Sequence, residues 1–223
     1  MKHLFAGPYV QTTFRPWAKG LENVPSTGPA ILASNHLSVI DSIFLPLVLR
    51  RRVSFLAKSD YFTGPGIKGF VIRNLLKSLG QLSIDRSGGK ASEASLQTGL
   101  SVLRRGELLG IYPEGTRSPN GKLFRGRTGV ARMILEGHVP VVPVAMIDTE
   151  KAMPIGKRIP RVRRIGVVIG EPLDFSRFEG FESDRFILRS ITDEIMVEIA
   201  RLSGQEYLDV YASTLRQTPA RAA

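Results

Sequence analysis

Short apolar segments alternate along this chain with longer segments in which apolar residues recur every three or four positions. The short segments are typical of buried strands, and the longer ones of helices that bury one face. Strands are expected at 30–33, 53–57, 81–84, 108–112, 139–147 and 165–169. Helices are expected at 38–49, 67–79, 91–105, 128–136 and 184–202. Because strands and helices alternate, the pattern predicts an α/β fold with a mixed, mostly parallel sheet flanked by helices.

The expected helices have identifiable ends and faces. Glycines should end two of them, the helix 91–105 at Gly106 and the helix 128–136 at Gly137. The last helix carries an aliphatic stripe made of Ile187, Ile191, Ile195, Ile199 and Leu202. The helix 67–79 has an apolar face of Val71, Ile72, Leu75, Leu76 and Leu79, opposite Arg73, Asn74 and Lys77.

The two ends of the chain lack such patterns. Residues 1–27 contain repeated Gly and Pro and are expected to be irregular. We expect an irregular segment at 1–19, one domain at 20–215 and a flexible tail at 216–223. The N-terminus has no uninterrupted apolar run, so no signal peptide is expected. No stretch reaches the roughly 20 apolar residues that would cross a bilayer, so no transmembrane span is expected.

Composition narrows the chemistry. The chain has 223 residues, no Cys and three His. This excludes disulfides, thiolate nucleophiles and cysteine-ligated metals, and leaves little for a zinc site. The net charge of +11 favours an anionic partner such as nucleic acid, acidic lipid or a phosphorylated substrate, or else a basic, merely soluble surface. No G-x-x-x-x-G-K-[ST] loop and no G-x-S-x-G turn occur, which disfavours P-loop nucleotide enzymes and α/β hydrolases.

The segment NHLSVID at 35–41 places His36 five residues before Asp41. A histidine readily acts as a base near neutral pH, and a carboxylate on its other ring nitrogen fixes its tautomer. On a continuous helix, residues five apart diverge by about 140°. The pair can therefore meet only if His36 precedes the helix and folds back, which Asn35 and Ser38 favour. Alternatively, His36 is a surface histidine and Asp41 a favourable charge near a helix start.

The segment YPEGTRS at 112–118 combines a carboxylate, Glu114, with Gly115 and Arg117. Gly115 permits a tight turn, and Arg117 offers a planar fork suited to phosphate. Further cations follow within ten residues, at Lys122, Arg125 and Arg127. The segment therefore predicts an anion-binding loop; the alternative is a solvated basic loop.

His36, Arg86 and Glu114 each lie just beyond the C-terminal end of an expected strand. Open α/β sheets bind their ligands at this edge. We therefore expect the two segments to meet there. A base beside an anion-binding loop is what a transferase needs in order to activate a hydroxyl on a phosphorylated substrate.

In residue type, order and spacing, the chain resembles the glycerolipid acyltransferases of the 1-acyl-glycerol-3-phosphate type, the PlsC family. The four blocks of that family correspond to His36 with Asp41, 80–86, 112–118 and 139–144. The resemblance covers about residues 20 to 175. The chain departs from the pattern in one respect. It has no long hydrophobic N-terminal segment of the kind that many members carry, which leaves its mode of membrane attachment open.

The resemblance implies a single-domain fold of the glycerolipid acyltransferase type and a reaction. An acyl group would pass from acyl-CoA or acyl-carrier protein to the free hydroxyl of lysophosphatidic acid or a related lysolipid, giving phosphatidic acid in phospholipid biosynthesis. No metal and no tightly bound cofactor are implied. His36 would be the general base, Asp41 would orient it, and Glu114 would order the site or contact the glycerol. The phosphate would be held by Arg86, Gly115, Thr116 and Arg117, with support from Lys122 and Arg125.

The resemblance also gives the basic surface a partner, an anionic membrane. Cations at 50–52, on the Arg73/Lys77 face and at 157–164 could meet acidic lipid. The apolar face of 71–79 would either insert into the interface or pack on the sheet. We expect a peripheral, monotopic enzyme on the cytoplasmic face of the membrane and no nucleic-acid partner.

Three alternatives stay open. The acceptor could be glycerol-3-phosphate, a lysophospholipid with a head group, or another lipid. The chain could be a catalytically idle basic protein that binds membrane or nucleic acid. It could also be a hydrolase that uses His36 and Asp41 on water. Loss of thioester that depends on an acceptor would favour an acyltransferase over an idle binding protein or a hydrolase.

Overall fold

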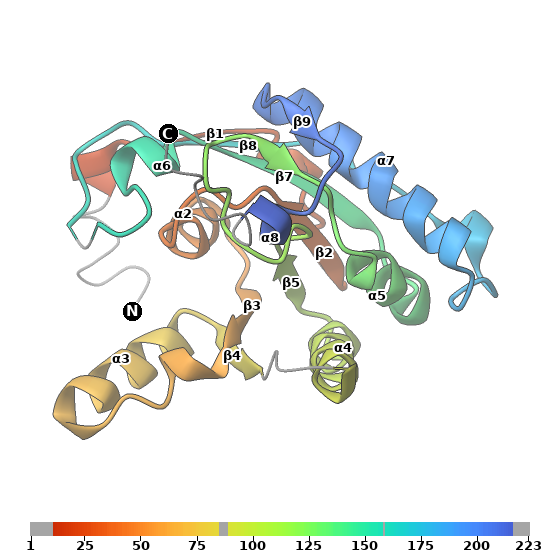
Figure 1. Ribbon diagram of the computed structural model, residues 1–223, viewed down its shortest axis with the longest axis horizontal. Helices are drawn as coiled ribbons and strands as arrows, with labels where there is room; N and C mark the ends of the chain where they lie inside the picture. Colours follow the sequence, from red (N-terminus) through yellow and green to blue (C-terminus); the bar gives the residue numbers. More distant parts are fainter. Residues whose placement is uncertain (1–10, 85–88, 158, 216–223) are drawn as a thin grey trace, which may run out of the picture.

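The computed structural model of the chain describes residues 11–84, 89–157 and 159–215. A seven-stranded sheet forms its centre, in the order β1-β8-β7-β2-β5-β3-β4 (Figure 1). Its strands are β1 Trp17–Lys19, β2 Ala30–Ser34, β3 Val53–Lys58, β4 Gln81–Ile84, β5 Leu108–Ile111, β7 Val141–Ile147 and β8 Gly166–Ile169. Only β7 and β8 pair antiparallel; the other neighbours are parallel. The mixed, mostly parallel sheet expected from the sequence is confirmed.

All five expected helices are present. The helices are α2 Asp41–Val48, α3 Gly66–Ser78, α4 Gly89–Arg104, α5 Gly129–Gly137, α6 Thr149–Ala152, α7 Arg185–Ser203 and α8 Ala212–Leu215. Short 3-10 turns occur at η1 Leu21–Asn23, η2 Ser59–Tyr61 and η3 Ser176–Phe178. Two further strands, β6 Leu123–Phe124 and β9 Tyr207–Leu208, form a small separate parallel sheet. Among the described helices, none combines the length and the apolar character needed to cross a bilayer.

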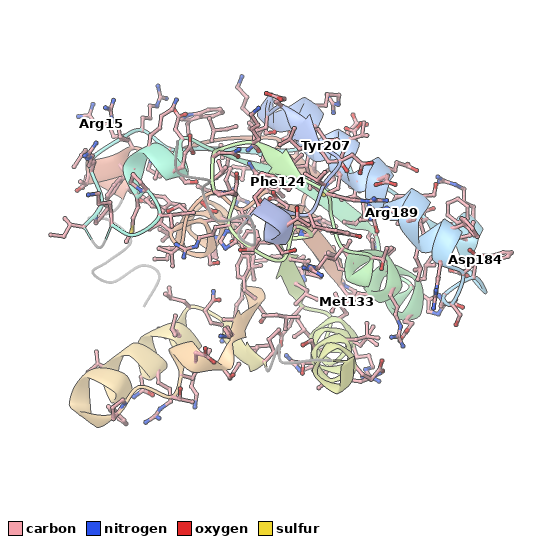
Figure 2. All side chains as sticks on the ribbon, in the orientation of Figure 1. Arg15, Phe124, Met133, Asp184, Arg189 and Tyr207 are labelled. Carbon is pink, nitrogen blue, oxygen red and sulfur yellow. The ribbon has the colours of Figure 1, made fainter. Side chains whose placement is uncertain are left out.

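The sheet buries side chains on both faces. Along β2, Ile31 and Ala33 point into a core shared with α4, α5 and α7, while Ala30 and Leu32 point into a core shared with α2. This alternation follows from the two-residue period of a strand. Met133 of α5 lies between α5 and α4 (Figure 2), where its Sδ would be 2.9 Å from a Cβ at Gly99. The continuous apolar runs of the sequence are therefore strands covered on both sides.

Residues 17–19, expected to be irregular, form strand β1 at one edge of the sheet. Trp17 pairs with Gly166 of β8, where an added Cβ would lie 2.3 Å from the indole ring. The prediction of an irregular segment was wrong here, because a three-residue strand has too few positions to show alternation. Its pairing joins residues about 150 positions apart, which no local pattern reveals.

The end of α5 also differs from the expectation. Gly137 is the last helical residue, and His138 adopts the left-handed conformation that caps the helix, with φ of 48°. A Cβ at Gly137 would lie 3.2 Å from Leu103 of α4. The glycine therefore permits close packing between helices rather than the turn itself.

The apolar stripe of α7 is confirmed at its centre. Ile191, Ile195 and Ile199 are fully buried. Helix α3, in contrast, leaves Phe70 and Val71 more than half exposed. In Figure 1 it lies beside β4 at the end of the sheet. The side chains of two other members of its expected face, Ile72 and Leu75, lie outside the described part.

We predict that Gly110→Ala destabilises the protein by about 1–3 kcal/mol. Gly110 lies in β5, and an added Cβ would be 2.2 Å from the ring of Phe55, which is itself buried in the neighbouring strand β3. Urea unfolding measures the effect. Gly129→Ala is the matched control, because nothing lies within 4 Å of the added atom and alanine favours a helix. Equal stability of the two variants would contradict the packing argument.

Candidate active site

The histidine and the carboxylate of the first motif are in contact. His36 Nδ1 lies 2.9 Å from Asp41 Oδ2. Asp41 is fully buried, and the His36 side chain is 17% exposed. Since Nδ1 faces the carboxylate, the ring presents Nε2 on its other side. The contact is confirmed, so His36 is not an isolated surface histidine. Asp41 is also the first residue of α2, where a negative charge is favourable.

The turn that joins the two residues explains how they meet. Helix α2 begins at Asp41 rather than at residue 38, so His36 precedes it. Asp41 Oδ2 accepts the backbone N–H groups of Leu37 and Ser38 at 2.8 and 2.9 Å. The carboxylate therefore folds the chain back over itself. Ser38, expected to cap the helix, instead donates its hydroxyl to Met153 O at 2.7 Å.

Tyr112, the residue after strand β5, fixes the plane of the histidine ring. The two rings stack with their centroids 3.9 Å apart and an angle of 11° between them. The Tyr112 hydroxyl lies 2.9 Å from Ser42 Oγ on α2. Burial, and next the nearby Asp41 carboxylate, raise the pKa of Tyr112 well above its ordinary value, so its hydroxyl stays neutral. In the sequence, the indication of this stacking role was only that an aromatic residue stands at the end of an expected strand.

Glu114 joins the two motifs through their backbones. It is 3% exposed. Its Oε2 accepts the N–H of His36 at 3.1 Å, and its Oε1 accepts the N–H of Phe124 at 2.9 Å. In return, Ser118 N–H donates to His36 O at 2.7 Å. The second motif is thus held against the first by two hydrogen bonds, and Glu114 also binds the backbone of Phe124.

Burial raises the pKa of Glu114 to about 7. The two amide bonds lower it, and the charge of Asp41 raises it further, but removal of the carboxylate from water is the largest effect. The site therefore holds two buried carboxylates on either side of His36. Of these, Asp41 contacts the ring and Glu114 contacts the backbone.

The loop predicted to bind an anion forms the turn that the sequence indicated. Gly115 has φ of 72°, a conformation that favours glycine, and its N–H donates to Tyr112 O at 2.9 Å. Thr116 and Arg117 follow it, both partly exposed. Within the part of the chain that the structure describes, Arg117 makes no hydrogen bond or ion pair. Its guanidinium is therefore available to an anion.

The other expected cations differ in their surroundings. Lys122 pairs with Glu206 at 2.8 Å, and Arg125 lies 3.3 Å from Asp209. Arg127 packs its side chain within 3.2 Å of the position a Cβ would take at Gly115. Lys122 and Arg125 are thus engaged by carboxylates from the C-terminal segment, which the sequence did not indicate. Arg86 lies outside the described residues.

Asn35 is a site residue that sequence reasoning treated only as a turn former. Its amide accepts the N–H of Met146 at 2.7 Å and donates to Met146 O at 3.0 Å. It also donates to Gln205 Oε1 at 2.6 Å, and Gln205 donates to Gly121 O. Asn35 thereby connects the ends of β2 and β7 to the C-terminal segment. Its partners are more than 100 residues away, so no local signal could identify them.

The C-terminal segment after α7 supports the loop that carries the second motif. Strand β9 pairs with β6, and Phe124 and Tyr207, labelled in Figure 2, belong to these two strands. The guanidinium of Arg125 also lies over the ring of Tyr211. The site is therefore built from three distant parts of the chain. Within the described ranges, no three His, Asp or Glu side chains gather as metal ligands.

Comparison with known proteins gives a consistent picture. The family model described as Acyltransferase matches residues 16–147. The 1-acyl-sn-glycerol-3-phosphate acyltransferase of Bacillus subtilis is 29% identical over 186 residues, which cover 82% of this chain and 86% of that protein. The chloroplastic enzyme LPAT1 of Arabidopsis thaliana, which carries the same activity in its name, is 29% identical over 181 residues, 78% of this chain and 49% of its own length.

The chain thus spans about half the length of LPAT1, and likewise of the chloroplastic relative BAT2 from Brassica napus. Among solved structures, the crystal structure of the 1-acyl-sn-glycerophosphate acyltransferase PlsC from Thermotoga maritima is similar, with a TM-score of 0.65 and 24% identity. The match between the two structures covers 96% of this chain and 78% of the PlsC chain. At this identity, the likeness establishes the fold.

We predict that Glu114→Gln destabilises the protein by about 1–3 kcal/mol. Both carboxylate oxygens accept backbone N–H groups, whereas a glutamine offers one oxygen and turns an NH₂ toward the second donor. Thermal unfolding measures the loss. Glu194→Gln, on the exposed side of α7, is the control and should change stability by no more than about 0.5 kcal/mol. An unchanged melting temperature for Glu114→Gln would show that the two hydrogen bonds accepted by Glu114 do not stabilise the fold.

The raised pKa of Glu114 predicts a pH dependence of stability. Between pH 4.5 and about 7 the folded protein keeps the proton that the unfolded chain has lost. Its contribution to stability is therefore full below pH 4.5 and falls as pH rises, by at most about 1.4 kcal/mol per unit. Urea unfolding of wild type and Glu114→Gln at pH 5 and pH 8 measures this effect. The difference in free energy of unfolding in favour of wild type should be smaller at pH 8 than at pH 5. A constant difference would contradict the shift.

Proposed function

The chain belongs to the acyltransferase family, and we propose that it transfers an acyl group from a thioester to the free hydroxyl of 1-acyl-glycerol-3-phosphate. The product is phosphatidic acid, for phospholipid biosynthesis. The observation that carries the proposal is the buried His36–Asp41 pair held against a glycine turn whose Arg117 has no partner among the described residues. The printed activity of the relatives from Bacillus subtilis and Arabidopsis thaliana supports this choice of acceptor.

In this proposal His36 is the general base. Asp41 keeps the proton on Nδ1, so Nε2 removes the proton of the acceptor hydroxyl as its oxygen bonds to the thioester carbonyl carbon. The tetrahedral intermediate then expels the thiolate, which takes the proton from the imidazolium and leaves as a thiol. Stacking on Tyr112 stabilises the charged ring through its π face. Transfer is direct, without an acyl-enzyme.

Glu114 acts as a positioning residue in this mechanism. Both of its oxygens are used by backbone amides, which supports ordering of the site over contact with the glycerol. By holding the N–H of His36, it sets where the base lies relative to the turn at Gly115. A base must lie within hydrogen-bond reach of the proton it removes, so this placement matters for the rate.

The acceptor phosphate would bind at Arg117, assisted by Gly115 and Thr116. Arg117 is partly exposed and without a partner among the described residues, which supports its use as an anion ligand. Arg86, two residues past the end of β4, is proposed as a second ligand. Lys122 and Arg125 would strengthen the local positive field only indirectly, because Glu206 and Asp209 offset their charges.

The donor would be acyl-CoA or acyl-carrier protein, as a co-substrate, with no tightly bound cofactor. Since the acceptor carries an acyl chain, we propose that the protein works as a peripheral enzyme at an anionic membrane surface, on its cytoplasmic face. The net charge of +11 supports such a partner. A free phosphate on the acceptor fits Arg117, which no described residue engages, better than a lysophospholipid with a large head group does.

We predict that purified protein releases thiol from palmitoyl-CoA only when 1-acyl-glycerol-3-phosphate is present, and that His36→Ala lowers this rate by about 10²–10⁴-fold. The fold should survive, since His36 makes one side-chain hydrogen bond and one stacking contact. Circular dichroism checks this.

The control is His138→Asn, which replaces an exposed histidine at the other edge of the sheet with a residue that tolerates its backbone conformation. It should keep full activity. Full activity of His36→Ala would remove the base from the mechanism. Thiol release without acceptor would favour a hydrolase, and no release with either donor would favour a binding protein.

A further inference from the structure

The loop between α6 and β8, residues 153–164, exposes large aliphatic side chains. Ile159 is 82% exposed, Val162 65% and Ile155 44%. A single exposed aliphatic residue is ordinary on a protein surface. Three lie within eight positions of this loop, and the described residues leave all three exposed. Such groups mark surfaces that meet a partner.

The same loop is strongly basic. Between residues 151 and 170 the sequence has six Lys or Arg and no Asp or Glu. Those described on the loop, Lys157, Arg161, Arg163 and Arg164, are all exposed. Within the described residues none of the four makes an ion pair. Their charges are therefore uncompensated and attract an anionic surface.

The loop lies at the catalytic edge of the sheet. It leaves from α6, a single turn that follows the carboxyl end of β7, and returns to the start of β8. Strand β7 runs parallel to β2, and β8 is antiparallel to β7. Both of its ends are thus at the edge where β2 leads to His36. Figure 1 shows it in blue-green beside α6, on the side of the molecule away from α5.

A direct hydrogen bond joins the loop to the catalytic turn. Ser38, whose N–H binds the Asp41 carboxylate, donates its hydroxyl to Met153 O at the start of the loop. The next residue of the turn, Val39, is 46% exposed. The turn that carries His36 therefore also exposes an apolar side chain and is bonded to the loop.

The base of the loop and one of its turns are fixed by backbone hydrogen bonds. Arg161 N–H donates to Ala152 O at 2.7 Å and closes the loop at its base. Lys157 N–H donates to Pro154 O at 3.1 Å, in a turn where Gly156 has φ of 85°. A loop held in this way loses little conformational entropy when it binds, because its backbone is already ordered.

We infer that the 153–164 loop docks the protein on a bilayer that contains anionic lipid. Ile155, Ile159 and Val162 insert into the interface, and the loop cations contact the phosphate head groups. Apolar and cationic side chains alternate along the loop, which suits a surface where tails and phosphates lie within a few ångströms of each other. The inference rests on the proposed function, since a lipid acceptor would then reach His36 from the membrane side.

Vesicle sedimentation tests the inference with matched variants of the full chain. The double variant Ile155→Ser/Ile159→Ser should bind phosphatidylcholine–phosphatidylglycerol vesicles about tenfold more weakly than wild type. The control, Phe186→Ser/Val197→Ser, removes two exposed apolar side chains from α7 and should bind as wild type does. The triple variant Lys157→Gln/Arg163→Gln/Arg164→Gln should lose about a hundredfold. Pure phosphatidylcholine should bind wild type weakly.

Several results would overturn the inference. One is unchanged vesicle binding by the serine variant. Another is an equal loss of vesicle affinity in the α7 control. A third is wild-type binding that does not depend on the content of anionic lipid. A wild type that does not bind vesicles would also overturn it. A loop variant that changes only the oligomeric state, measured by size exclusion, would assign the surface to a second copy of the chain instead.

A soluble assay keeps this inference apart from the proposed function. With a short-chain acceptor dispersed below its micelle concentration, the serine variant should transfer acyl groups at the wild-type rate. If wild type itself shows no transfer in this assay while the loop still governs vesicle binding, the proposed reaction fails and the docking surface stands.

Discussion

The site depends on one buried carboxylate. Asp41 Oδ2 accepts three N–H groups, from the His36 ring and from the backbones of Leu37 and Ser38. A charge taken out of water is costly unless such donors replace the lost hydration. The same three bonds that compensate the charge also bend the chain at the end of β2, start α2 and orient the histidine. Local structure and chemistry therefore share a single interaction, and neither could be altered without the other.

A second constraint fixes this turn within the sheet. Glu114 and Ser118 bind the backbone N–H and C=O of His36, so the strand end of β5 determines where the histidine lies. Parallel pairing of β2 with β5 brings the two strand ends to one edge. The hydrogen bonds accepted by Glu114 require a carboxylate that is removed from water, and its pKa of about 7 reflects that burial. Burial of Glu114 therefore lowers the stability of the folded protein near neutral pH, while its hydrogen bonds fix the geometry of the site.

The same edge gathers the surfaces that a lipid substrate would meet. The turn at His36, the loop around Arg117 and the 153–164 loop all follow strands that end there. The opposite edge carries the start of α7, with exposed Phe181 and Phe186 among carboxylates such as Glu179 and Glu182. The exposed apolar side chains of the 153–164 loop thus lie among cations, whereas carboxylates lie near those at the start of α7. This local difference would favour contact of the loop, rather than of the start of α7, with an anionic surface.

The sequence by itself determined five helices and six strands, because these depend on local periodicity. It offered the contact between His36 and Asp41 through one short turn as one of two interpretations. The parallel sheet followed from the alternation of elements, and with it the meeting of the two motifs at strand ends. Tertiary structure alone decided the rest. Strand β1, the bonds of Asn35 and Gln205, and the pairing of Lys122 and Arg125 with the C-terminal segment join residues more than 80 positions apart. No spacing rule encodes such contacts, since only the packing of the whole chain brings those residues together.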